Sequence, residues 1–134
     1  MPSLLGGLLT FAPAAHAGQA GGSSTPTLGE ALAPSSNEQL ELTEHLRRIG
    51  ALFYGAWWCP ACFRQKSLFG QQAGDRLPYV ECDKTKEGRE RCQEASIKAY
   101  PTWVLGSLRV EGVQTIEELK RWSGFSPAPA RLNP

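Results

Sequence analysis

The sequence contains little of what most metal and nucleic-acid sites require. Its 134 residues include only two histidines, His16 and His45, and its formal net charge is +1. A charge so close to zero predicts no general attraction to nucleic acid or to an anionic membrane. The sequence also has no phosphate-binding glycine loop and no internal repeat. These absences exclude a repeat architecture and argue against a nucleotide site.

Cysteine is scarce as well, but two of the four cysteines form a motif. Cys59 and Cys62 stand three positions apart, directly after an apolar run and at the start of a helical pattern. Side chains with this spacing on one helical turn face the same way, so the two sulfurs can meet. The positive end of a helix favours a thiolate, and Pro60 suits the first helical position. The motif therefore predicts a redox dithiol.

The same motif is also compatible with half of a zinc site or with two inert cysteines. A zinc site needs two more ligands at a compatible spacing. The remaining cysteines, Cys82 and Cys92, have nine residues between them, and the histidines lie far away in sequence. We therefore expect no metal and no cofactor. His45 is interpreted as a surface or packed residue and His16 as a spacer.

Cys82 and Cys92 are interpreted as a structural disulfide. The first ends a predicted strand and the second lies in the following helix, so a bridge ties the loop between them to the domain. In the chain-entropy description, closing a loop of this size stabilises the fold by about 3 kcal/mol. A second redox pair that relays electrons to Cys59 and Cys62 is the alternative, and free thiols are a third possibility.

Composition divides the chain into four parts. Residues 1–17 join a short apolar run to Ala15-His16-Ala17, which fits the cleavage rule of an export signal, although no Lys or Arg precedes the run. Residues 18–36 are rich in small residues and proline, as in a flexible linker. The predicted domain covers 37–125, and 126–134 is a disordered tail. A disordered apolar tail, or the end of a membrane helix, is the alternative for 1–17.

Hydrophobic periodicity predicts an α/β domain with a central mixed sheet of about four strands flanked by helices. Helices are expected from Ser35 or Ser36 to Gly50, over 60–72, over 87–98 and after Thr115, and strands over 51–56, 77–82, 98–105 and 108–111. Gly106-Ser107 matches a two-residue hairpin loop. The expected order is therefore β-α-β-α-β-β-α after a leading helix.

The helical patterns also carry expectations about single side chains. Ser35 with Glu38 has the spacing of a capping box. The spacing predicts ion pairs between Glu44 and Arg48 and between Glu117 and Arg121. In the helix over 60–72, three polar side chains are expected in solvent: Arg64, Gln65 and Lys66.

A strand, Trp-Cys-x-x-Cys, a helix and then Tyr-Pro-Thr before a hairpin resemble the thioredoxin superfamily. Within it the sequence is most similar to the thioredoxin-like domain of bacterial and plant vitamin K epoxide reductase homologues. The resemblance covers about 40–125, and four segments carry it: 53–62, 65–70, 77–82 and 100–103. In that family the domain is often fused to a four-helix membrane protein that oxidises it with quinone. The resemblance therefore implies a membrane-bound oxidase of that type as a partner.

The resemblance also implies roles for individual residues. Cys59 is the attacking thiolate and Cys62 resolves the mixed disulfide. Pro101 is a cis-proline packed against the pair, with an ordinary trans turn as the alternative. The expected substrate-binding residues are Trp57, Trp58, Pro60, Tyr100, Pro101 and Thr102. Core packing of one tryptophan is the alternative to a place on the binding rim.

One position departs from the family pattern. Strongly reducing thioredoxins carry a buried acid six positions before the first cysteine, and Phe53 occupies that position here. A carboxylate that takes the proton of the resolving thiol is therefore missing from the expected place. This difference favours an oxidase or isomerase over a reductase.

Together these features predict a protein-disulfide oxidoreductase that is monomeric and exported to a periplasm or thylakoid lumen. It would exchange disulfides with client proteins through Cys59 and Cys62. The alternatives are a reductase that supplies electrons to one client, and a non-enzymatic module that binds a partner or a metal.

Overall fold

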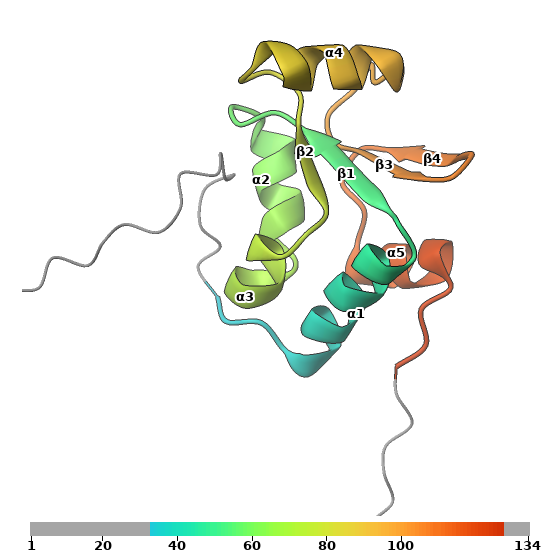
Figure 1. The fold of residues 1–134 in the computed structure, drawn as a ribbon. Coiled ribbons are helices and arrows are strands. Elements are labelled where there is room, and N and C mark those ends of the chain that lie inside the picture. Colours follow the sequence, from blue (N-terminus) through green and yellow to red (C-terminus); the bar gives the residue numbers. More distant parts are fainter. Residues whose placement is uncertain (1–32, 128–134) are drawn as a thin grey trace, which may run out of the picture.

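The computed structural model describes residues 33–127, which form five helices and four strands within that range (Figure 1). The helices are α1 (Asn37–Arg48), α2 (Pro60–Ser67), α3 (Gly70–Asp75), α4 (Lys86–Glu94) and α5 (Ile116–Ser123). The strands are β1 (Leu52–Gly55), β2 (Tyr79–Glu81), β3 (Thr102–Leu105) and β4 (Leu108–Glu111). The order agrees with the prediction except that two helices, α2 and α3, lie between β1 and β2.

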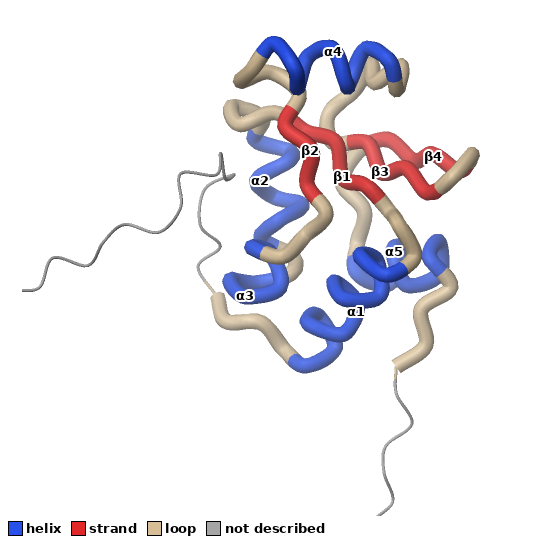
Figure 2. The backbone as a smooth tube through the Cα atoms, viewed as in Figure 1, coloured by secondary structure: helices blue, strands red, loops and turns tan. Residues whose placement is uncertain are grey.

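The four strands form one mixed sheet in the order β2-β1-β3-β4. β1 pairs with β2 in parallel, and β3 pairs antiparallel with both β1 and β4. Figure 2 shows the strands side by side, with the helices around them. The predicted α/β class and the thioredoxin-like mixed sheet are therefore confirmed. The dithiol motif follows β1, a central strand buried along most of its length.

The two faces of the sheet have separate cores. Phe53 and Trp103 stack in the larger core, with ring centroids 4.8 Å apart, and α1, α2, α3 and α5 contribute to it. Tyr54 points to the opposite face and packs in a smaller core beneath α4. In Figure 1, α4 accordingly lies on one side of the strands, and α1, α3 and α5 lie on the other. Alternation along β1 thus sends Phe53 and Tyr54 into different cores, and Cys59 and Cys62, which follow the strand, belong to the larger one.

The single helix predicted over 60–72 is wrong. The chain breaks after Ser67 and begins α3 at Gly70, whose φ of +78° favours glycine. A Cβ at Gly70 would lie 2.8 Å from the Cα of Ser35, so the segment before α1 approaches this backbone closely. The Ser35 hydroxyl donates to Phe69 O at 2.7 Å and accepts from Ala73 N at 2.9 Å. The Ser35 hydroxyl therefore bonds to the backbone on both sides of the start of α3, where the predicted helix is interrupted.

The prediction that Ser35 caps the first helix is consequently also wrong. Ser36 is the N-cap, and it forms a capping box with Gln39. The end of the predicted linker contacts the domain, because Ala33 O accepts from Gln71 N at 2.8 Å, although Ala33 itself is exposed. The linker interpretation of 18–36 stays a prediction.

Polar side chains account for the remaining corrections. Gln65 and Lys66 are buried rather than solvated, and Arg64 alone of the three is exposed. The two ion pairs expected from helical spacing have other partners: Glu44 pairs with Arg76, and Glu117 pairs with Lys120. Helix periodicity gives a side chain its direction but not the neighbour that the tertiary fold brings to it.

The predicted export signal, most of the predicted linker and most of the predicted tail lie outside the described residues. Within residues 33–127, none of the helices has both the length and the apolar character needed to cross a membrane.

Candidate dithiol site

Cys59 and Cys62 lie at the start of α2, shortly after the end of β1. Cys59 is the N-cap residue, and its sulfur accepts a hydrogen bond from Cys62 N at 3.1 Å. Pro60 occupies the first helical turn and is exposed. A sulfur at an N-cap faces the unpaired backbone N–H groups of the helix, an arrangement that favours negative charge there. Cys59 thus has the environment expected of an attacking sulfur.

The two cysteines differ in exposure. Cys59 is 5% exposed, whereas Cys62 is completely buried. Both are free thiols in this structure. Only Cys59 can therefore meet a visiting protein, while Cys62 lies behind it within the core.

Gly55 makes room for the buried sulfur. A Cβ at this position would lie 2.8 Å from Cys62 Sγ, which is closer than such atoms approach. Any larger residue at 55 would displace Cys62. The last residue of β1 therefore has to be glycine for α2 to pack this close to the sheet.

Two tryptophans project beside the dithiol. Trp57 is 54% exposed and Trp58 is 51% exposed, so neither is a core residue. Trp58 Nε1 donates to Asp83 Oδ2 at 2.6 Å, and its ring meets the edge of Tyr100 with centroids 5.9 Å apart. These contacts hold Trp58 as a fixed apolar surface next to Cys59.

The segment before β3 lies on the same side of the molecule. The Tyr100–Pro101 peptide bond is cis, as the family resemblance implies. Pro101 is buried and Tyr100 is partly exposed. Thr102 is completely buried, and its hydroxyl donates to Ala99 O at 2.7 Å. Of these three residues, Tyr100 therefore presents the most side-chain surface.

Burial governs the protonation of Cys62. It raises the pKa of the Cys62 thiol well above its ordinary value, and hydrogen bonding to Cys59 and the charge of Glu81 add to the effect. The thiol therefore stays protonated at neutral pH. A reaction of Cys62 as a thiolate would thus require a proton acceptor.

The raised pKa of Cys62 predicts a pH-dependent stability of the reduced protein. Folding stabilises the protonated thiol, so this stability is complete below the unfolded pKa of about 8.5 and is lost as pH rises above it. Between pH 7.5 and 9.5, we expect reduced wild type to lose about 1 kcal/mol more than Cys62→Ala. Urea denaturation at both pH values measures the difference. Equal losses would contradict the prediction.

Cys82 and Cys92 form the predicted disulfide, with Cα atoms 5.6 Å apart. Both are buried in the smaller core, and the bridge joins the end of β2 to α4. Cys82 directly precedes Asp83, the residue that accepts the hydrogen bond from Trp58 Nε1. The bridge therefore anchors the loop on which the tryptophan contact depends.

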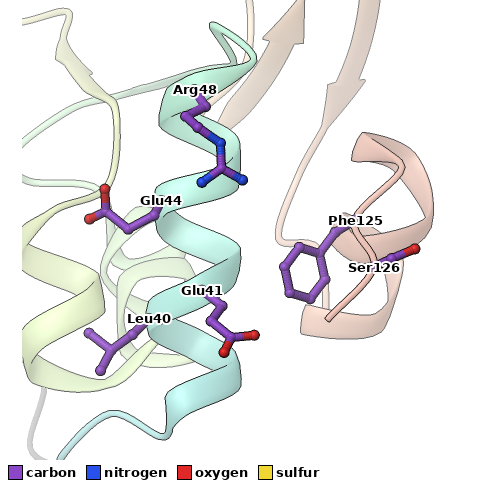
Figure 3. Close-up of a pocket in the computed structure, with 6 residues that line it drawn as sticks. All are labelled: Leu40, Glu41, Glu44, Arg48, Phe125 and Ser126. Atoms are coloured by element: carbon purple, nitrogen blue, oxygen red, sulfur yellow. The ribbon is translucent and has the colours of Figure 1, made fainter. Parts of the chain in front are cut away.

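One hollow adjoins the dithiol site, and another lies away from it. One, of about 170 Å³, has the disulfide, Asp83 and Tyr100 among its lining residues, so it adjoins the Trp58 side of the dithiol. The other, of about 410 Å³, lies between α1 and the segment after α5 (Figure 3). Its lining includes none of the predicted site residues: Leu40, Glu41, Glu44, Arg48, Phe125 and Ser126. We therefore assign no part of the dithiol site to it.

Several residues near the dithiol were not predicted from sequence. Asp83 is one of them, and it orients Trp58 by accepting the hydrogen bond from Nε1. Gln65 ties α2 to the sheet: its Oε1 accepts from Trp103 Nε1 at 3.1 Å, and from Gln114 N at 2.7 Å. Glu81 lies beside Gly55 across the β1–β2 pairing. Strand alternation could have placed Glu81 on one face, but only the register brings it to the motif.

A mixed sheet followed by a CxxC pair at a helix start, with a cis-proline directly before β3, defines a thioredoxin-like dithiol protein. No protein-family model matches the chain. Over 97 residues, however, the chain is 40% identical to the thiol-disulfide oxidoreductase LTO1 of Arabidopsis thaliana. The match covers 69% of this chain and 26% of that relative. The chain thus spans about a quarter of the length of this curated relative.

Proposed function

We propose that this protein is a thiol-disulfide oxidoreductase that exchanges disulfides with client proteins through Cys59 and Cys62. The observation that carries the proposal is the position of Cys59 as the N-cap of α2, slightly exposed and hydrogen-bonded from Cys62 N. The similarity to a thiol-disulfide oxidoreductase supports the same chemistry. The exposed tryptophans beside Cys59 offer apolar surface to an unfolded client.

The difference in burial between the two cysteines supports one order of steps for the exchange. The thiolate of Cys59 attacks a client disulfide, and the sulfur–sulfur bond of the client breaks as the mixed disulfide forms. Cys62 then attacks Cys59 from inside the fold and releases the client. In the opposite direction, a client thiolate opens the Cys59–Cys62 bond. Because Cys62 is fully buried, clients meet Cys59 in both directions.

Replacing Cys62 by alanine is expected to trap clients. Without the resolving sulfur, the mixed disulfide on Cys59 has no internal route of release, so adducts that dithiothreitol reverses should accumulate. Non-reducing electrophoresis of the tagged variant, expressed in a host that exports it, measures them. The matched control is Cys59→Ala with Cys62→Ala, which should form none. Equal adducts in the control, or none in either variant, would overturn the proposal.

We further propose export to a periplasm or thylakoid lumen, action as a monomer, and reoxidation by a membrane-bound, quinone-linked oxidase of the vitamin K epoxide reductase type. The apolar run over 4–12 and the Ala15-His16-Ala17 sequence support export. The Cys82–Cys92 disulfide supports an oxidising compartment. Thiol trapping in cells tests the direction of electron flow. An oxidised Cys59–Cys62 pair that becomes reduced when the oxidase is absent is the expected result, and a pair reduced at all times would contradict it.

A further inference from the structure

The strand beside the dithiol carries a carboxylate next to the resolving cysteine. Glu81 is the last residue of β2 and pairs with Gly55 of β1, the residue on which Cys62 packs. Tyr79 and Glu81 are two positions apart in one strand, so their side chains leave the same face of the sheet. Tyr79 packs against the core that contains Cys62. Glu81 is therefore on the Cys62 side of β2.

Two hydrogen bonds fix the Glu81 carboxylate. The Tyr79 hydroxyl donates to Oε1 at 2.8 Å, and Asp83 N donates to Oε2 at 2.7 Å. Each oxygen has one donor, which sets the orientation of the group. The partly buried side chain is thus positioned rather than free in solvent.

Tyr79 joins this carboxylate to the sulfur. A Cβ at Gly55 would lie 2.8 Å from Cys62 Sγ and 3.0 Å from Tyr79 Cε2, so the sulfur and the phenol edge border the same small space. Cε2 is bonded to the ring carbon that bears the hydroxyl. Burial, followed by the hydrogen bond to Glu81, raises the pKa of Tyr79. The phenol therefore remains protonated and continues to donate to the carboxylate.

We propose that Glu81 accepts the proton of Cys62 when that thiol attacks and returns it when Cys62 leaves, and that Tyr79 is the positioning residue for its carboxylate. The inference rests on the proposed exchange function. Strongly reducing thioredoxins carry their buried acid at the β1 position that Phe53 occupies here, stacked in the core. The proposal places the equivalent carboxylate on β2 instead.

The proton and the electrons balance in each direction. As Cys62 resolves a mixed disulfide, the bond between its sulfur and that of Cys59 forms. The bond from Cys59 to the client sulfur breaks, and the client leaves with the electron pair as a thiolate. The Cys62 proton passes to the Glu81 carboxylate. When a client thiolate instead opens the Cys59–Cys62 bond, Glu81 returns the proton to the departing Cys62 sulfur.

Few other ionisable groups face this carboxylate. Tyr79 lies on the same strand, Cys62 comes from α2, and Tyr100 comes from the segment before β3, where the charges of Asp83 and Glu81 contribute to its raised pKa after burial. Asp83 follows in the next loop, and its carboxylate is engaged by Trp58. With both tyrosines protonated and Asp83 engaged, Glu81 is the proton acceptor that remains among these groups, and its charge contributes to the raised pKa of Cys62.

Single-turnover reaction with dithiobis(nitrobenzoate) tests the proposal on the full chain. The first nitrothiobenzoate is released when Cys59 attacks the reagent, and the second when Cys62 resolves the adduct. In Glu81→Gln we expect the second phase to slow about 100-fold at pH 7 while the first is unchanged. The slow phase should then rise about tenfold per pH unit, because hydroxide replaces the carboxylate, whereas wild type should vary less.

Two further variants keep the result interpretable. Tyr79→Phe retains the ring and removes only the hydroxyl, and we expect its second phase to slow by about tenfold. Glu111→Gln, an exposed residue of edge strand β4, should behave as wild type. A second phase in Glu81→Gln with the wild-type rate and pH slope would overturn the proposal, as would equal slowing of both phases.

The reagent replaces the client, so this result does not depend on the trapping experiment. A wild-type protein that reacts in two phases but traps no client would overturn the proposed function and leave the role of Glu81 standing. A wild-type protein without a second phase would overturn both.

Discussion

Cys59→Ser is expected to reduce disulfide exchange to the uncatalysed rate, a loss of at least about 100-fold in insulin reduction by dithiothreitol. A serine hydroxyl at the N-cap still accepts the backbone hydrogen bond, so α2 should form normally. It cannot form a bond to a client sulfur, and Cys62 is too deeply buried to replace it. The variant therefore separates the chemistry of the sulfur from its role in the fold.

Cys62→Ser is the matched variant for this experiment. It should also lose turnover, yet its single-turnover reaction with the chromogenic disulfide should keep the fast first phase, because Cys59 is intact. Wild-type turnover in Cys59→Ser would contradict the assignment of Cys59. Loss of the first phase in Cys62→Ser, with Cys59→Ser still reactive, would reverse the roles of the two cysteines.

Opening the Cys82–Cys92 bridge is expected to lower the free energy of unfolding by about 3 kcal/mol, because the unfolded chain regains the entropy of the closed loop. For a domain of this size, such a loss lowers Tm by roughly 10–20 °C. The effect is large because the described domain is small and its second core contains both sulfurs. Thermal unfolding followed by circular dichroism measures the change.

The experiment is best performed in the Cys59→Ala, Cys62→Ala background. Oxidised and reduced forms of that protein differ only in the bridge, so neither a cavity nor the dithiol contributes to the difference. In the same background, the Tm of Cys82→Ala with Cys92→Ala should equal that of the reduced form, apart from the effect of removing the two sulfur atoms. Equal Tm values for the oxidised and reduced forms would show that the bridge does not stabilise the fold.

Local chemistry in the sequence was sufficient to predict that Cys59 and Cys62 lie at the start of a helix. A strand, two cysteines three positions apart and a proline at the first helical turn specify a helix start and the face on which the sulfurs lie. The cis bond at Pro101 and the bridge from Cys82 to Cys92 were also predicted, the first from the family resemblance and the second from strand and helix positions. These features depend on short stretches of chain.

Contacts between distant segments could not be predicted in this way. Ser35 breaks the predicted helix because it packs on Phe69 and Ala73, more than thirty residues away. Gln65 is buried because Trp103 and Gln114 satisfy its amide. Periodicity alone predicts that a polar side chain lies in solvent, because the partners that allow it to be buried belong to other elements.

By itself, the sequence determined the dithiol, its place at a helix start and the mixed sheet that supports it. Only the tertiary structure decided which cysteine is accessible and which groups surround the other. The register of β1 with β2 brings Glu81 beside Gly55, and a shift of one residue would turn that carboxylate to the opposite face. Strand pairing is set by the packing of the whole sheet, so no local motif contains it.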